Sequence, residues 1–196
     1  MMKKISGACG IASQVVVLTA LLVVIANSPW FSWTGNHISV LGVKGSVTAL
    51  FNWGLILAGL LGVFFAIGLK KNLPFSRLNN LGVLSLILGS MALLAIGVFP
   101  RSIDLPHDIA SISFFIFIIM ALLFIGMAMI TVPRKGWGLF SLTSGVLIII
   151  FWLIPWSWDG GAIPQLLFCL PWSLWTIVFA VDLITKTEPF DVRRLA

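Results

Sequence analysis

The residues of this chain best suited to chemistry gather in one short segment, Gly97-Val-Phe-Pro-Arg-Ser-Ile-Asp-Leu-Pro-His-Asp-Ile-Ala110, which separates two long apolar runs. Arg101, Asp104, His107 and Asp108 fall within eight residues of one another. An imidazole beside a carboxylate can act as a general base or hold a metal, and a guanidinium can pair with a phosphate. The segment is therefore predicted to form part of a site, although these residue types do not specify a reaction.

Other polar residues accompany this segment at the ends of neighbouring apolar runs. If successive runs cross a membrane in alternating directions, these residues all reach the same side as the 97–110 segment. Polar groups at membrane depth are costly unless they face a bundle interior or a wet cavity. The sequence therefore predicts an outward-opening polar pocket, with these candidate ligand-binding residues: Asn36, His37, Asn52, Arg101, Asp108, Asp159 and Gln165.

The elements that position these residues are membrane-spanning helices. The chain is 60% hydrophobic and only 9% charged, with a mean hydropathy of +1.13, so it lacks the polar surface of a soluble domain. Spanning a bilayer takes about 20 apolar residues per helix. The sequence predicts an all-α bundle of six transmembrane helices forming a single domain over residues 1–196, with helices at about 5–28, 47–69, 78–99, 109–132, 136–156 and 162–184.

The distribution of lysine and arginine predicts the orientation, because cytoplasmic loops carry an excess of these residues. In a six-span topology only Lys44 and Arg101 fall on the side of the predicted pocket. Both termini are therefore expected in the cytoplasm, with the protein in the plasma membrane. Scattered cations do not form the compact basic patch that nucleic acids require, so no nucleic-acid partner is expected. The opposite side carries Lys3, Lys4, Lys70, Lys71, Arg77, Arg134, Lys135, Lys186, Arg193 and Arg194.

Small residues recur along the second and third runs at spacings that favour close helix packing. Gly54, Ala58, Gly62 and Ala66 are four apart, and a second small face contains Gly82, Ser85 and Gly89. Such stripes let helix backbones approach one another in lipid. They are interpreted as packing surfaces, either within one bundle or between protomers, so a monomer or a homodimer is expected.

Gln14 is the main polar residue of the first run. A single amide in a helical bundle usually makes a hydrogen bond between helices. It is therefore predicted to be structural.

Three functions compete for the predicted pocket. In the first, the pocket binds a membrane lipid or lipid-like amphiphile, with Arg101 pairing a phosphate. In the second, the polar residues form a hydrogen-bond network that fastens the loops to the bundle, and the protein is a non-catalytic structural or assembly protein. In the third, the protein is a metal-dependent hydrolase that acts on a lipid.

The metal hypothesis rests on the two histidines. His37 and His107, with Asp104, Asp108 or Asp159, provide ligand types that suit zinc and leave a coordination position open for water. No tight ligand spacing such as HExxH is present, so zinc is a hypothesis without a motif. The candidate metal ligands are His37, His107 and Asp104.

A catalytic role is considered for the same turn. His107 is the candidate base or ligand and Asp104 its partner. A metal-free arrangement would add Ser111 as nucleophile, but a serine four residues from a histidine on one helix does not by itself give a catalytic triad.

Several short motifs are spread along the chain: Asn36-His37-Ile38-Ser39 with Leu41-Gly42, Phe51-Asn52-x-Gly54 with Gly59, Gly97-Val98-Phe99-Pro100 with 107–110 and Phe114-Phe115, and Ala162-Ile163-Pro164. Together they resemble the domain-of-unknown-function 998 family of prokaryotic membrane proteins. That family is similar in turn to the eukaryotic Frag/DRAM/Sfk group of six-helix proteins, which is associated with lipid remodelling, phosphoinositide regulation and autophagy. The resemblance implies a lipid-linked role and no established activity. Gln165 stands where the family has a glutamate, which argues against a carboxylate ligand there.

Overall fold

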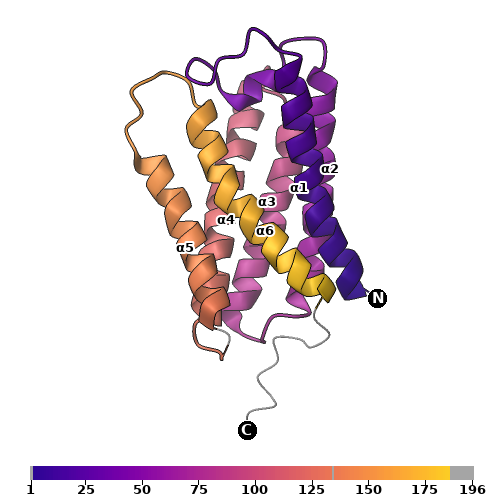
Figure 1. The fold of residues 1–196 in the computed structure, drawn as a ribbon, viewed down its shortest axis with the longest axis vertical. Helices are drawn as coiled ribbons and strands as arrows, with labels where there is room; N and C mark the ends of the chain where they lie inside the picture. The colour runs from indigo at the N-terminus through magenta and orange to yellow at the C-terminus, as the bar shows by residue number, and fades with distance from the viewer. Residues whose placement is uncertain (1, 134, 186–196) are drawn as a thin grey trace.

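The computed structural model describes residues 2–133 and 135–185, and six long helices account for most of them (Figure 1). All six are long and apolar enough to cross a membrane, and the described residues contain no strand. The predicted all-α, six-helix fold is therefore confirmed. The helices are α1 (Met2–Ala26), α2 (Thr48–Lys70), α3 (Arg77–Val98), α4 (Asp104–Met129), α5 (Lys135–Leu153) and α6 (Ala162–Thr185), with a short 3-10 helix, η1 (Ile38–Gly42), before α2.

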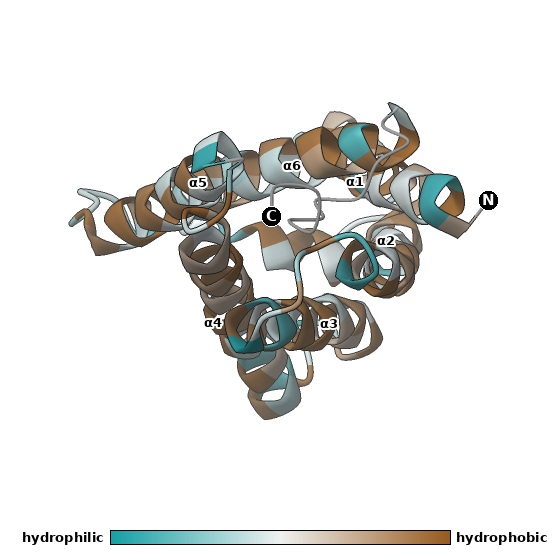
Figure 2. Cartoon of the chain, turned by 90° about the horizontal axis from the view of Figure 1, so that it is seen from below, coloured by the Kyte–Doolittle hydropathy of each residue, from teal (hydrophilic) through white to brown (hydrophobic). Residues whose placement is uncertain are grey.

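The helices form a closed ring in which each packs against its neighbours in the sequence and α6 returns to α1. Figure 2 views this ring from the end where α1 begins and α6 ends, here called the proximal end. Hydrophobic residues cover most of the helix sides, and hydrophilic residues gather near helix ends and loops. Lys3, Lys70, Arg77 and Lys135 lie at the proximal end, at helix ends. Arg134, Lys186, Arg193 and Arg194 lie outside the described residues.

Several helix ends differ from the sequence-based bounds, and proline explains the differences at the start of α4 and at the end of α5. α4 begins at Asp104, before the predicted start at 109, because Pro106 falls in the first helical turn, where a backbone N–H has no helical partner to lose. α5 ends at Leu153 because Pro155 disfavours a helical conformation at Ile154.

The small-residue stripes are packing surfaces, as predicted. A Cβ atom at Gly59 would lie 2.6 Å from the backbone of Ser90 on α3, so only glycine permits this approach of α2 to α3. Along the stripes themselves, Gly54 faces Ala20 of α1 and Gly82 faces Ile125 of α4. Within lipid, where apolar surface gains little by leaving the solvent, such close van der Waals contact holds helices together.

The densest part of the core lies in the proximal half of the ring. Trp175 is fully buried and stacks on Phe179, with ring centroids 4.3 Å apart. Phe65 of α2 meets Trp175 edge-on, and the Trp175 indole N–H donates a hydrogen bond of 2.8 Å to Ser141 Oγ. This aromatic group (Phe65, Trp137, Trp175 and Phe179) fills the space between α2, α5 and α6 and is called the proximal plug.

Candidate functional site

The loops at the opposite end of the ring, here called the distal end, are joined by backbone hydrogen bonds. Gly160 N donates to Thr34 O at 2.8 Å, and Ala162 N donates to Asn36 O at 2.9 Å. The Gln165 side-chain oxygen accepts a third bond from Ile38 N at 2.8 Å. The segment that follows α1 is thereby fastened to the start of α6. This set of residues (Thr34, Asn36, Ile38, Gly160, Ala162 and Gln165) is the distal clasp.

Two of the predicted ligand-binding residues, Asn36 and Asn52, hold backbone groups by hydrogen bonds, and a third, His37, packs against the loop before α6. The Asn36 side-chain oxygen accepts a 2.8 Å bond from Ser32 N, and Asn52 Nδ2 donates a 2.9 Å bond to Gly42 O, which ties η1 to α2. The ring of exposed His37 lies against Gly161, where any side chain would collide with it. These contacts fit the loop-fastening alternative without testing a binding role.

The turn between α3 and α4 holds the other charged candidates. His107 is buried, and its Nδ1 lies 2.8 Å from Phe99 O, so Nδ1–H is the donor because a carbonyl can only accept. Arg101 and Asp108 form an ion pair on the surface, with side chains 43% and 47% exposed. Asp104 is exposed in the first turn of α4, where a carboxylate interacts favourably with the helix dipole.

The described residues contain no group of three or more His, Cys, Asp or Glu side chains that could hold a metal ion. His37 packs at the loop between α5 and α6, whereas His107 is bonded within the α3–α4 turn. Asp159 is exposed in the loop before α6. The zinc hypothesis therefore finds no support in the geometry. His107 Nδ1 is bonded to Phe99 O, and no hydrogen bond joins His107 to Asp104 within the described residues, so their catalytic pairing stays a prediction.

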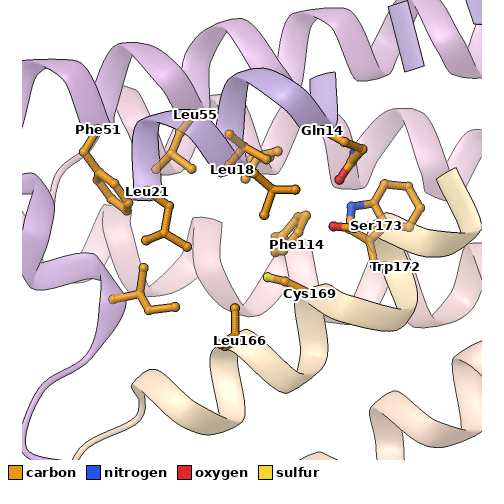
Figure 3. Close-up of a pocket in the computed structure, with 13 residues that line it drawn as sticks. Gln14, Leu18, Leu21, Phe51, Leu55, Phe114, Leu166, Cys169, Trp172 and Ser173 are labelled. Carbon is orange, nitrogen blue, oxygen red and sulfur yellow. The ribbon is translucent and has the colours of Figure 1, made fainter. Parts of the chain in front are cut away.

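The ring is hollow in its distal half. A partly enclosed cavity of about 100 Å³, the inner compartment, lies between α1, α2, α4 and α6 (Figure 3). A second cavity of about 100 Å³, the outer compartment, continues it toward the loops and shares six of its lining residues. Together they form the distal chamber. The shared residues are Ile38, Phe51, Leu55, Leu93, Phe114 and Cys169.

The chamber is apolar along its walls and polar only at its two ends. Gln14 of α1 and Ser173 of α6 lie at the deep end of the inner compartment. Ser39, Ser111 and Gln165 line the outer compartment, nearest the loops. No charged side chain lines either compartment. The site is thus an apolar chamber with hydrogen-bonding ends, and not the broad polar pocket expected from the sequence.

The inner compartment lies where α1 and α6 separate. The two helices touch near the proximal end, where a Cβ at Gly7 would lie 2.6 Å from Ala180 O, and they diverge toward the distal end in Figure 1. Leu18 and Leu21 of α1 line one side of the resulting space, and Leu166 and Cys169 of α6 line the other. Because both helices span the membrane, the chamber wall at this separation faces the acyl chains of the bilayer.

The comparison with protein families identifies the chain's relatives. The model of one family, described as a protein of unknown function (DUF998), matches residues 10–182. The chain belongs to the DUF998 family. Among the curated proteins and the solved structures no match was found. The chamber of this DUF998 protein lies entirely within the matched residues, because its lining extends from Gln14 to Ser173.

In this DUF998 protein, sequence reasoning identified the loop residues and missed the chamber. Gln14 was interpreted as a helix-to-helix hydrogen bond, yet its amide makes no hydrogen bond within the described residues and lies at the deep end of the chamber. Burying such a group unsatisfied costs about 1–3 kcal/mol. Two signals were available in the sequence. Gln14 is a lone amide in the first apolar run, and Ser173 follows Cys169 by four residues in the sixth run.

Proposed function

We propose that this protein binds a lipid or lipid-like amphiphile from the bilayer in the distal chamber. The observation that carries the proposal is the apolar hollow at the separation of α1 and α6, within the membrane-spanning part of the ring. An apolar cavity of about 150 Å³ lined by Leu, Ile and Phe admits benzene. Two joined compartments of about 100 Å³ each therefore suit a chain end or a single ring.

The contrast with the proximal half supports this proposal. Protein interiors are packed with few voids larger than a water molecule, and each void forfeits van der Waals contacts. The proximal plug meets this standard with four interlocking aromatic rings. The apolar hollow that lies beside this packed group, between α1 and α6, is explained if a ligand fills it.

The family adds a second line of support. The motif resemblance to the Frag/DRAM/Sfk group, through the DUF998 family, favours a lipid-linked role. The excess of lysine and arginine at the proximal end supports a plasma-membrane orientation with that end in the cytoplasm. In that orientation the chamber belongs to the outer leaflet, and its occupant is a lipid of that leaflet.

Photolabelling in lipid nanodiscs tests the proposal. The probe is hexadecane carrying a diazirine near one end, and the labelled positions are mapped by mass spectrometry. We expect label at Leu18, Leu21 and Cys169, which line the chamber. Leu22 and Leu170, which are 66% and 51% exposed on the outside of the ring, provide the reference for label from bulk lipid.

Two tryptophan substitutions on α6 separate occupancy of the chamber from contact with lipid. Leu166→Trp fills the chamber that Leu166 lines, whereas Leu170→Trp places the same side chain on the outside of the helix. We expect Leu166→Trp to lower chamber label at least fivefold relative to the outside, equivalent to about 1 kcal/mol of binding free energy. In Leu170→Trp, the ratio of label in the chamber to label on the outside of the ring should match that of the wild type. Equal ratios in the two variants would refute the proposed site.

A further inference from the structure

The deep end of the inner compartment carries three polar side chains that make no hydrogen bond within the described residues. Gln14, Trp172 and Ser173 are 3%, 7% and 8% exposed, and Figure 3 shows them together at one end of the chamber. Within the described residues the Gln14 amide, the Trp172 indole N–H and the Ser173 hydroxyl make no hydrogen bond. One turn further along α6, the Thr176 hydroxyl is also buried without a partner. The first three residues are called the chamber floor.

Several other polar side chains of the helices are hydrogen-bonded within the protein. Ser13 Oγ donates to Ala58 O at 2.9 Å, Ser144 Oγ to Phe140 O at 2.8 Å, and the Trp175 indole N–H to Ser141 Oγ. Ser13 is the neighbour of Gln14 in α1, and Trp175 lies three residues after Trp172 in α6. Ser13 and Trp175 are thus hydrogen-bonded within the protein, whereas the nearby side chains that line the chamber, Gln14, Trp172 and Ser173, make no hydrogen bond within the described residues.

The chemistry of the chamber floor selects the kind of group that would satisfy it. An amide and a hydroxyl can donate and accept, and an indole N–H can only donate, so the floor is richer in donors than in acceptors. An oxygen acceptor, such as a carbonyl or a hydroxyl, matches this set. None of the residues that line the inner compartment is charged, so a phosphate or sulfate there would be buried without a counter-charge, which is strongly unfavourable.

We propose that the chamber binds an uncharged amphiphile with its polar end inward, its carbonyl or hydroxyl oxygen hydrogen-bonded by Gln14, Trp172 and Ser173. This inference rests on the proposed function and adds the class and the orientation of the ligand. The hydrocarbon part of the ligand then follows the apolar walls, past Leu21 and Leu166, toward the separation of α1 and α6. Phospholipids with charged headgroups are excluded from this orientation.

Three photoprobes that differ only in one end group test the inference. Hexadecanol, hexadecyl sulfate and hexadecane each carry a diazirine beside that end, and each is added to the protein in nanodiscs. We expect the alcohol to label positions adjoining Gln14 and Ser173 at the chamber floor. The sulfate should leave the floor unlabelled, because its charge finds no partner there.

Gln14→Leu and Gln165→Leu provide a matched pair of variants. Both replace an amide by an alkyl group of similar size, one at the chamber floor and one at the distal clasp. We expect Gln14→Leu to lower floor labelling by the alcohol at least fivefold, with labelling by hexadecane retained. Gln165→Leu should retain the alcohol label at the floor. Retained hexadecane label also shows that Gln14→Leu has kept its fold.

The outcomes separate this inference from the proposed function. If hexadecane occupies the chamber but the alcohol labels the floor no better in wild type than in Gln14→Leu, the inward orientation is wrong and the proposed function stands. Floor labelling by the sulfate equal to that by the alcohol would overturn the requirement for an uncharged group. If no probe labels the chamber above the outside reference, the inference and the proposed function both fail.

Discussion

The two halves of α6 differ in how their side chains pack and form hydrogen bonds inside the helix ring. In the proximal half, Trp175 and Phe179 stack with each other and meet rings from α2 and α5, and the Trp175 N–H is hydrogen-bonded. In the distal half, Trp172 stacks on Trp175 at 5.7 Å but turns its other side to a cavity and leaves its N–H open. Tryptophan is therefore packed in the core at position 175 and lines the chamber at position 172.

This difference separates the part of the ring that stabilises the fold from the part in which we propose a binding site. Lipid solvates apolar side chains about as well as other helices do, so a membrane bundle depends on close packing and satisfied polar groups. The proximal plug provides both. At the floor of the distal chamber, Gln14, Trp172 and Ser173 make no hydrogen bond within the described residues, and we propose that a ligand satisfies them.

The largest expected effect comes from truncating the two tryptophans in parallel. Trp175→Ala removes a fully buried ring and the hydrogen bond to Ser141, and large-to-small core changes of this kind cost about 3–5 kcal/mol. Trp172→Ala should cost clearly less, because one side of its ring already faces a cavity. Unfolding of the purified protein with increasing denaturing detergent measures both. A larger loss for Trp172→Ala would reverse the assignment of the two halves.

The next effect concerns the proximal contact between α1 and α6. Gly7→Ala puts a methyl group 2.6 Å from Ala180 O, and this overpacking should cost about 1–3 kcal/mol and widen the separation of the two helices. Gly136→Ala is the matched control, because nothing lies within 4 Å of a Cβ at Gly136. The same unfolding assay compares them. If both variants are equally stable, the contact does not hold the helices together.

At the chamber floor we expect a smaller change in the free energy of unfolding, and this change should stabilise the protein. Gln14→Leu removes a buried amide without a partner, so the ligand-free protein should gain about 1 kcal/mol of unfolding free energy. Ser13→Ala is the control on the adjacent residue, where loss of the bond to Ala58 O should destabilise the protein. Thermal unfolding of delipidated protein distinguishes the two signs. Destabilisation by Gln14→Leu would mean that the amide is structural after all.

The smallest effect is expected at the distal surface. Arg101→Ala breaks the exposed ion pair with Asp108, and pairs of this kind contribute about 0–1 kcal/mol. Because Arg101 does not line the chamber, chamber labelling by the hexadecanol probe should be unchanged. The labelling assay in nanodiscs measures this. A loss of label in Arg101→Ala would restore the phosphate-pairing role expected from the sequence.

The fold could be predicted from the sequence because its determinants are local. Uninterrupted apolar runs define helices, small-residue stripes define close contacts, and both agree with the structure. The start of α4 was misplaced because Pro106 is compatible with either an extended segment or a first helical turn. Only the bond from His107 N to Ile103 O shows that the turn is helical.

The site was less predictable because it depends on the space between helices. The loop candidates Asn36, Asn52 and His107 are polar and stand out in an apolar chain, yet each is engaged in fastening backbone. A cavity leaves no mark in composition, because leucines that line it look like leucines that fill a core. The hollow lies where α1 and α6, which touch at Gly7, diverge toward the distal end (Figure 1).

The distal clasp restricts how far the distal ends of α1 and α6 can separate. It joins the segment after α1 to the segment before α6 through the bonds from Gly160 to Thr34 and from Ala162 to Asn36. The separated ends of these two helices are therefore tethered to each other. If a ligand enters between α1 and α6, as we propose, the intact tether limits how far their distal ends can move apart to admit it.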